Sequence, residues 1–151
     1  MSRALLDTNL LLLLIVGTFD PARVTNHARL SAYSEEDLGT LLGLLEPFSL
    51  HVSLPNILTE ASNLLKVGHP SVDPRLGSAF AAYCQNLDEV YQPSRDVTAT
   101  EAFVKFGLTD AAIVRSLRAD VTILTDDYAL SGVIASAGGR VINIRHSQMP
   151  Q

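Results

Sequence analysis

Short apolar runs that alternate with helical segments are the feature that most constrains the fold of this chain. The clearest run is Val121–Leu124, a Val-Thr-Ile-Leu segment followed at once by Thr125, Asp126 and Asp127. Similar runs at Arg3–Leu6, Phe48–Leu54 and Val141–Ile144 are also typical of buried strands. Strands that are separated by helices connect through right-handed crossovers into a parallel sheet. The alternation therefore predicts a three-layer α/β/α fold, with a mainly parallel sheet of four or five strands covered by helices on both faces.

The segments between these runs carry helix signals. Ser34 is a cap-type residue before an acidic first turn, and Pro55 suits the first position of a helix because its missing N–H costs nothing there. Residues 17–34 look polar and irregular, and Gly107 separates two helical segments. We expect helices at Leu10–Val16, Glu35–Leu45, Pro55 to about Lys66 (ending near Gly68 and Pro70), Arg75–Leu87, Thr98–Phe106, Thr109–Leu117 and about Tyr128–Ala137, and a short strand at Val90–Tyr91.

The length and composition indicate one globular domain over residues 1–151. Hydrophobic residues make up 47% of the chain and charged residues 18%, which excludes a disordered chain and allows a sizeable core. The net charge of −5 argues against a protein that coats nucleic acid through a basic face. It leaves open an enzyme whose metal ions neutralise its own carboxylates and a substrate phosphate. The single cysteine, Cys84, belongs to no metal-binding motif.

The apolar run Leu10–Val16 raises the question of a signal or membrane segment. It is far shorter than the roughly 20 residues that span a bilayer. Asp7 and Asn9 interrupt the approach to it, and no small-residue cleavage pattern follows it. We therefore interpret the run as part of the core, and expect a cytoplasmic protein with no membrane partner.

Acidic residues occur where a parallel sheet would place a ligand site. Asp7 follows the first strand, and Asp126 and Asp127 follow the strand at Val121–Leu124. Ligands of such sheets bind beyond the carboxyl ends of the strands. Each of these aspartates is also a plausible helix cap, so position alone leaves both roles open.

Two further acids lie on expected helices. Asp110 shares a helical face with Ile113, Val114 and Leu117, and a charge on an apolar face is costly unless it is paired or binds metal. Its place in a first helical turn offers an ordinary structural role instead. Glu60 lies in a polar stripe that is also typical of a solvated helix face. The combination of all these acids in one small domain favours a shared site.

A cluster of carboxylates suits metal-dependent hydrolysis of a phosphodiester. Mg²⁺ and Mn²⁺ prefer oxygen ligands, and one or two such ions can activate a water and neutralise the phosphate. We see no nucleophile elbow and no histidine pair spaced for zinc, so His27, His51, His69 and His146 are expected to be structural or on the surface. Arg115 and Arg118 are candidates for guiding a nucleic-acid backbone.

Four segments of the chain resemble, in order, the motifs of PIN-domain nucleases. Residues 5–9 (Leu-Leu-Asp-Thr-Asn) are similar to the opening motif, and residues 58–65 to the glutamate helix. Residues 108–113 (Leu-Thr-Asp-Ala-Ala-Ile) are similar to the third acidic motif, and residues 123–127 to the fourth, a strand that ends in Thr-x-Asp. The match covers nearly the whole chain, and the order of the four segments makes it more specific than any one of them.

The resemblance implies an endoribonuclease that depends on Mg²⁺ or Mn²⁺ and cleaves RNA. By position, Asp7, Glu60 and Asp110 would be catalytic metal ligands, with Asp127 as the fourth and its neighbour Asp126 as a further ligand or substitute. Asn9 and Thr125 would be supporting residues that orient the carboxylates. Many members of that family are ribonuclease toxins of VapBC-type toxin–antitoxin pairs, so the resemblance adds a small antitoxin protein and a homodimer to RNA as candidate partners. The long polar segment Asp20–Glu36 departs from the compact toxin pattern and leaves a stand-alone role in RNA processing open.

Other fold families explain the acids less well. A haloacid-dehalogenase-like phosphatase needs a second aspartate at the position of Asn9, and a dinucleotide-binding domain needs a Gly-x-Gly-x-x-Gly loop that the chain lacks. A receiver domain needs a lysine at a strand end, and neither Lys66 nor Lys105 is there. The main alternative is a catalytically inactive PIN-like module that binds RNA or protein without cutting.

Overall fold

The centre of the protein is a parallel sheet of short strands. The computed structural model describes residues 2–66 and 71–145. Within them, five strands lie in the order β3-β2-β1-β4-β5, and every neighbouring pair is parallel. The strands are β1 (Arg3–Leu6), β2 (Leu50–Ser53), β3 (Asp88–Glu89), β4 (Val121–Thr125) and β5 (Arg140–Asn143). The predicted parallel α/β fold is confirmed.

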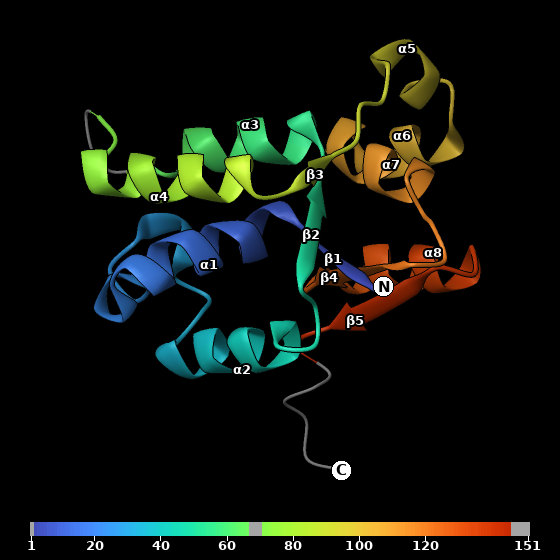
Figure 1. Ribbon diagram of the computed structural model, residues 1–151. Coiled ribbons are helices and arrows are strands. Elements are labelled where there is room, and N and C mark those ends of the chain that lie inside the picture. Colours follow the sequence, from blue (N-terminus) through green and yellow to red (C-terminus); the bar gives the residue numbers. More distant parts are fainter. Residues whose placement is uncertain (1, 67–70, 146–151) are drawn as a thin grey trace.

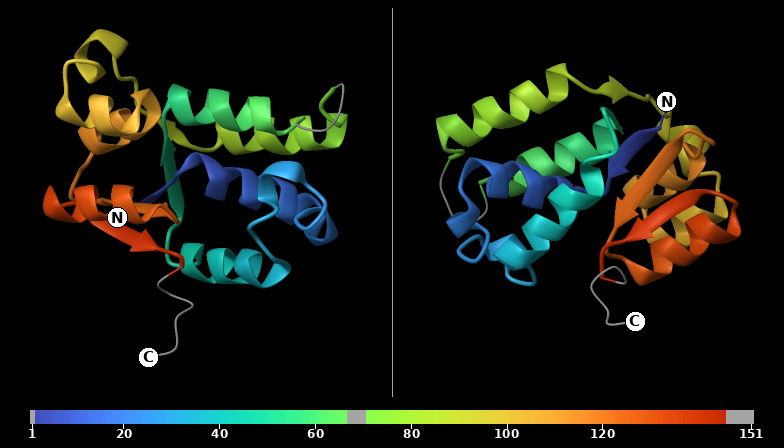
Figure 2. Two further views of the ribbon diagram at one scale, coloured as in Figure 1. Left: turned by 180° about the vertical axis from the view of Figure 1, so that it is seen from behind. Right: turned by 60° about the horizontal axis from the view of Figure 1, so that its bottom comes forward.

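The strands that follow β1 in the sequence are added on both sides of it. From β1 it passes to β2 and then β3 at one edge, and it returns through β4 to β5 at the other edge. Right-handed crossovers on opposite sides of β1 place their helices on opposite faces of the sheet. Figures 1 and 2 show this arrangement, with α1 to α4 on one side and α7 and α8 on the other. The carboxyl ends of β1 and β4 therefore meet at the point where the strand order reverses.

Helix α1 (Thr8–Phe19) is the main core helix. Leu10 to Leu13, Ile15 and Val16 are all buried, because α1 packs on the sheet and also against α2, α3 and α4. A helix that is apolar on most sides is expected in such a position. The interpretation of this run as core is confirmed. Among the described residues, no helix has both the length and the apolar character needed to cross a membrane.

Local signals explain several helix boundaries. Helix α2 (Glu35–Leu45) begins with a capping box, in which the Ser34 hydroxyl accepts from the Asp37 N–H and the Asp37 carboxylate accepts from the Ser34 N–H. Helix α3 (Pro55–Leu64) begins with proline. The other helices are α4 (Pro74–Gln85), α5 (Ser94–Val97), α6 (Glu101–Phe106), α7 (Leu108–Arg115) and α8 (Tyr128–Ser136), with 3₁₀ turns η1 (Pro21–Arg23) and η2 (Ala28–Leu30) in the irregular segment.

The observed bounds differ from the predicted ones by up to three residues, and two of these differences have a clear cause. The strand expected at Val90–Tyr91 lies at Asp88–Glu89, which pair with Val52 and Ser53 of β2. Because β2 ends at Ser53, the pairing stops after the hydrogen bond from the Val90 N–H to the Ser53 carbonyl. The helix expected from Thr98 begins at Glu101, where Thr100 caps it, and the short helix α5 precedes it. The expected end of α3 near Gly68 and Pro70 lies outside the described residues.

Candidate functional site

Asp7 lies at the junction between the central strand and the core helix. Its Oδ1 accepts a hydrogen bond from the Leu10 N–H at 3.0 Å, which caps α1, and its Oδ2 accepts one from the Thr125 hydroxyl. Its backbone N–H donates to the Leu124 carbonyl at 3.0 Å, so the sheet and the helix fix it together. The side chain is only 7% exposed. Asp7 is therefore both a helix cap and a nearly buried carboxylate at the strand ends.

The end of β4 supplies two more carboxylates that point to different neighbours. Thr125 is fully buried, and its hydroxyl accepts from the Asp127 N–H at 3.0 Å as well as donating to Asp7. Asp127 caps α8, because its Oδ1 accepts from the Leu130 N–H at 3.0 Å. Asp126 accepts a hydrogen bond from the phenol of Tyr33, which belongs to the segment between α1 and α2.

Glu60 and Asp110 reach the same place from helices on opposite faces of the sheet. Glu60 is exposed on α3, and its two carboxylate oxygens accept from the hydroxyls of Thr8 at 3.0 Å and Thr109 at 2.6 Å. Asp110 lies in the first turn of α7, just after Gly107, and is half-buried. The Thr109 hydroxyl thus links α7 directly to α3 beside the two acids.

These acids line one pocket of about 210 Å³, which we call the acidic pocket. All five candidate metal ligands and the supporting residue Asn9 belong to it, while Thr125 lies beneath it and holds Asp7. The lining residues are Asp7, Thr8, Asn9, Arg29, Glu60, Leu64, Asp110, Asp126, Asp127 and Leu130. The fold therefore brings together residues from the β1–α1 junction, α1, the α1–α2 connection, α3, α7, the β4–α8 turn and α8.

The acidic pocket disfavours negative charge on two of its members. Burial raises the pKa of Asp7 to about 7, and although the hydrogen bonds from Thr125 and Leu10 oppose that rise, the charges of Asp126 and Asp110 add to it. Burial also raises the pKa of Asp110 to about 6, with further contributions from Asp127 and Glu60. Carboxylates that repel one another in a small pocket favour either protons or a bound cation.

The donor set fits Mg²⁺ or Mn²⁺ in its chemistry, because both ions take hard oxygen ligands. The distances between these side chains fit an ion less well. Within residues 2–66 and 71–145, no three acidic, histidine or cysteine side chains are grouped closely enough to hold an ion as they stand. Asp127 caps α8 and Glu60 accepts from two hydroxyls, so holding an ion requires these exposed side chains to change their hydrogen bonds.

The structure also places residues at the acidic pocket that sequence reasoning missed. Arg29 lines it, while Thr8 and Thr109 bond to Glu60 and Tyr33 bonds to Asp126. Thr8 and Thr109 were open to prediction, since each directly neighbours an acid of a recognised motif. Nothing in the sequence pointed to Arg29 or Tyr33, because the polar segment that carries them shows no regular pattern.

The arginines and histidines named from the sequence lie elsewhere. Arg115 donates to the Gln92 side chain and lies 3.8 Å from the Asp96 carboxylate, and neither Arg115 nor Arg118 lines the acidic pocket. His27 caps η2 by accepting from the Arg29 N–H at 3.1 Å, and His51 bonds to the Tyr83 hydroxyl at 2.8 Å, so both have structural contacts. His69 and His146 lie outside the described residues.

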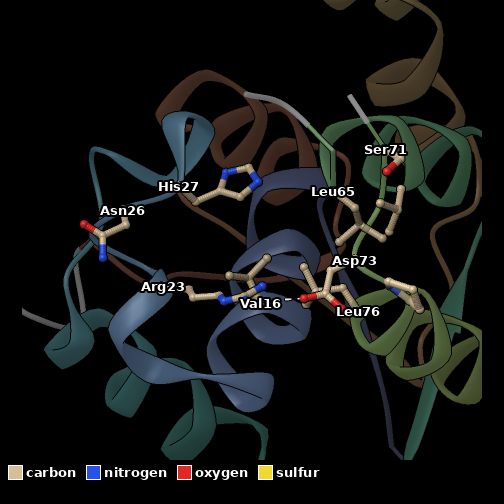
Figure 3. Close-up of a pocket in the computed structure, with 10 residues that line it drawn as sticks. Val16, Arg23, Asn26, His27, Leu65, Ser71, Asp73 and Leu76 are labelled. Carbon is tan, nitrogen blue, oxygen red and sulfur yellow. Dashed lines mark hydrogen bonds and ion pairs between the residues drawn. The ribbon is translucent and has the colours of Figure 1, made fainter. Parts of the chain in front are cut away.

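A separate pocket of about 580 Å³ lies beside the second half of α1 (Figure 3). Figure 3 shows Arg23 and Asp73 facing each other there, and an Arg23 nitrogen lies 3.3 Å from the Asp73 carboxylate. The Arg23 guanidinium also lies over the Phe19 ring at 4.9 Å. This arginine and this carboxylate thus pair within the protein, and none of the five candidate ligands lines this pocket.

Comparisons of the chain with family models, curated proteins and solved structures found no match. Any functional assignment therefore depends on the motifs in the sequence and the geometry of the acidic pocket.

Proposed function

We propose that this protein is a metal-dependent endoribonuclease of the PIN-domain type. The observation that carries the proposal is the convergence of Asp7, Glu60, Asp110 and Asp127, from four separate elements, on one small pocket at the reversal point of the sheet. Ligand sites of parallel sheets occur at this point. The four positions are also those of the four motifs that resemble PIN nucleases. A cytoplasmic location, expected from the interpretation of Leu10–Val16 as core, is part of this proposal, and the resemblance adds a small antitoxin protein and a homodimer as partners to test.

The residues of the pocket have distinct roles in this proposal. Asp7, Glu60, Asp110 and Asp127 would hold Mg²⁺ or Mn²⁺, with Asp126 as the further ligand from the same turn. The bound cation supplies charge neutralisation at the phosphate and lowers the pKa of the attacking water. Thr125 orients Asp7 through its donated hydrogen bond, and Thr8 and Thr109 orient Glu60 in the same way.

Arg29 is suited to contact the RNA phosphate. It is the basic residue in the lining of the acidic pocket, it is exposed, and among the described residues no carboxylate forms an ion pair with its side chain. Its position is fixed by neighbours, because Leu30 is fully buried and Tyr33 bonds to Asp126. A guanidinium held beside a set of carboxylates provides the positive charge that an approaching phosphate needs.

The test combines cleavage and binding. We expect wild-type protein to cleave RNA with Mg²⁺ or Mn²⁺ and to be inactive in EDTA. Asp7→Asn and Asp110→Asn should abolish cleavage and weaken Mn²⁺ binding in calorimetry while the fold is kept. Glu46→Gln, which changes an exposed acid outside the acidic pocket, is the control and should behave as wild type. Full activity of wild type in EDTA, or of Asp7→Asn with metal, would contradict the proposal.

A non-catalytic PIN-like module that binds RNA or protein is the second candidate. The observation that favours it is the lack, in the described residues, of three acids already grouped to hold an ion. This candidate predicts no Mn²⁺ binding that depends on Asp7 and Asp110, and retained RNA binding in EDTA. The calorimetric titration therefore separates the two functions.

A further inference from the structure

A second depression adjoins the acidic pocket and shares one residue with it. This α3–α7 groove has a volume of about 630 Å³ and is formed by the start of α3, the segment after β3 and the start of α7. Glu60 lines both the groove and the acidic pocket, and Thr109, which also lines the groove, donates a hydrogen bond to Glu60. A ligand that extends from the acidic pocket past Glu60 therefore enters the groove.

The groove has the chemistry of a site for an uncharged polar group. Apart from Glu60, its lining carries no charged side chain, whereas Asn56 and Gln92 supply amides. The Gln92 Oε1 accepts a hydrogen bond from Arg115, which orients the amide and leaves its N–H donors for a ligand. Phosphate sites need positive charge, so this lining suits a heterocycle with donors and acceptors along its edge better than a phosphate.

Tyr91 adds an aromatic surface to this lining. It follows the short strand β3, and its side chain is 74% exposed, so one face of the ring is open. Pro93 restricts Gln92 to an extended conformation and so keeps the two side chains in a defined order along the chain. Exposed aromatic rings beside polar side chains are the usual means by which proteins bind unstacked RNA bases.

We infer that the α3–α7 groove binds a nucleobase of the RNA substrate next to the cleaved phosphate, with the base stacked on Tyr91 and its edge bonded by Asn56 and Gln92. This inference rests on the proposed ribonuclease function. It adds a specificity site outside the metal ligands, and it makes cleavage depend on the identity or presence of one base near the cut. Glu60 belongs to both depressions, so the bound base lies close to the cleaved phosphate.

The test uses a short RNA that the wild type cuts at one bond and a series of the same RNA with one abasic nucleotide near that bond. Tyr91→Ala should raise KM about tenfold or more with a smaller change in kcat, since stacking contributes to binding. Tyr91→Phe keeps the aromatic ring and should therefore have the KM of wild type. Tyr128→Ala, which removes another highly exposed tyrosine, on α8, is the matched control and should leave KM unchanged. An abasic nucleotide at one position should raise KM strongly for wild type and little for Tyr91→Ala, because both changes remove the same stacking contact.

Binding of the same RNA in EDTA, followed by fluorescence anisotropy, tests the groove without catalysis. Tyr91→Ala should again weaken binding about tenfold, and Tyr91→Phe should not. Equal binding and KM for Tyr91→Ala and wild type, or no abasic position that couples to Tyr91, would overturn the inference. If wild type never cleaves RNA but Tyr91→Ala still weakens its binding in EDTA, the ribonuclease proposal fails while the groove retains its ligand.

Discussion

The buried hydroxyl of Thr125 donates a hydrogen bond to the carboxylate of Asp7 and so joins the ends of strands β4 and β1. The same hydroxyl accepts from the Asp127 N–H, so one small side chain holds two of the candidate ligands. Both bonds lie at the reversal point of the sheet, so this hydroxyl helps to fix the position of Asp7 in the acidic pocket.

Replacing Thr125 tests this connection. Thr125→Val keeps the shape but removes the donor to Asp7 and the acceptor for the Asp127 N–H. We expect a loss of about 1–3 kcal/mol in the free energy of unfolding, because buried polar groups are left unpaired. Mn²⁺ affinity should fall as well, since Asp7 loses the bond that favours its charged form. Thr125→Ser should retain both properties. Urea denaturation and calorimetry provide the measurements, and unchanged values for Thr125→Val would refute the role.

The raised pKa of Asp7 predicts a pH-dependent stability in metal-free protein. Its folded-state pKa is about 7 against an ordinary value of 3.8, so the folded state binds the proton more tightly than the unfolded state. Asp7 therefore destabilises the protein progressively as the pH rises from about 4 to 7, by up to about 4 kcal/mol. Asp7→Asn removes this effect. Relative to wild type in EDTA, the variant should gain stability between pH 4 and 8, and a constant difference across that range would show that Asp7 titrates normally.

Gly107 directly precedes α7, the helix that carries Asp110, and is predicted to be necessary for the stability of this connection. It lies between α6 and α7 with φ of +87° and ψ of −179°, a conformation that is essentially restricted to glycine. Gly107→Ala should cost about 1–3 kcal/mol through backbone strain alone, because an added Cβ meets no atom within 4 Å. Gly39→Ala is the matched control. Gly39 lies on the exposed side of α2 with equal space around it, so alanine there should stabilise the helix by about 0.5–1 kcal/mol. Thermal denaturation of both variants would reveal whether the signs are opposite.

Arg29 offers a test of the substrate side of the acidic pocket. Arg29→Ala should lower kcat/KM for RNA about tenfold or more, the effect of losing a hydrogen bond to a charged group. The dependence of RNA binding on salt should weaken, because one phosphate contact is lost. Mn²⁺ affinity should not decrease, since Arg29 is not a ligand and its positive charge repels cations. Arg118→Ala removes an exposed arginine outside the pocket and serves as the control. Equal losses in the two variants would indicate a general charge effect.

The elements that sequence patterns predicted well are those with strong local signals. The bounds of β1 match the prediction, as do those of α2, because an apolar run fixes the one and the cap at Ser34 fixes the other. The strand β3 was placed two residues late, since its position depends on which residues pair with β2 and not on its own composition. The helix α5 was missed because a four-residue turn has no periodicity to detect.

The candidate site divides in the same way. All five acids and Asn9 were predicted, and they do line one pocket, because strand ends and helix faces can be inferred from spacing. Each aspartate left two interpretations open. For Asp7 the cap is confirmed, since it caps α1, and its ligand role stays a prediction that its position in the pocket supports. The contacts of Arg29 and Tyr33 could not be predicted. They depend on how a segment without regular structure folds back over β4, which only the tertiary structure determines.

The double position of Asp7, as helix cap and pocket carboxylate, has a consequence for how such a protein can change over generations. If the protein is the proposed ribonuclease, a descendant without that activity is free to lose Glu60 and Asp110, and replacing Asp110 would relieve a half-buried charge. Position 7 is different, because α1 still needs a side chain that accepts from the Leu10 N–H. Descendants without activity should therefore carry Asp, Asn, Ser or Thr there, so a cap that remains at this position is a record of descent and not of catalysis.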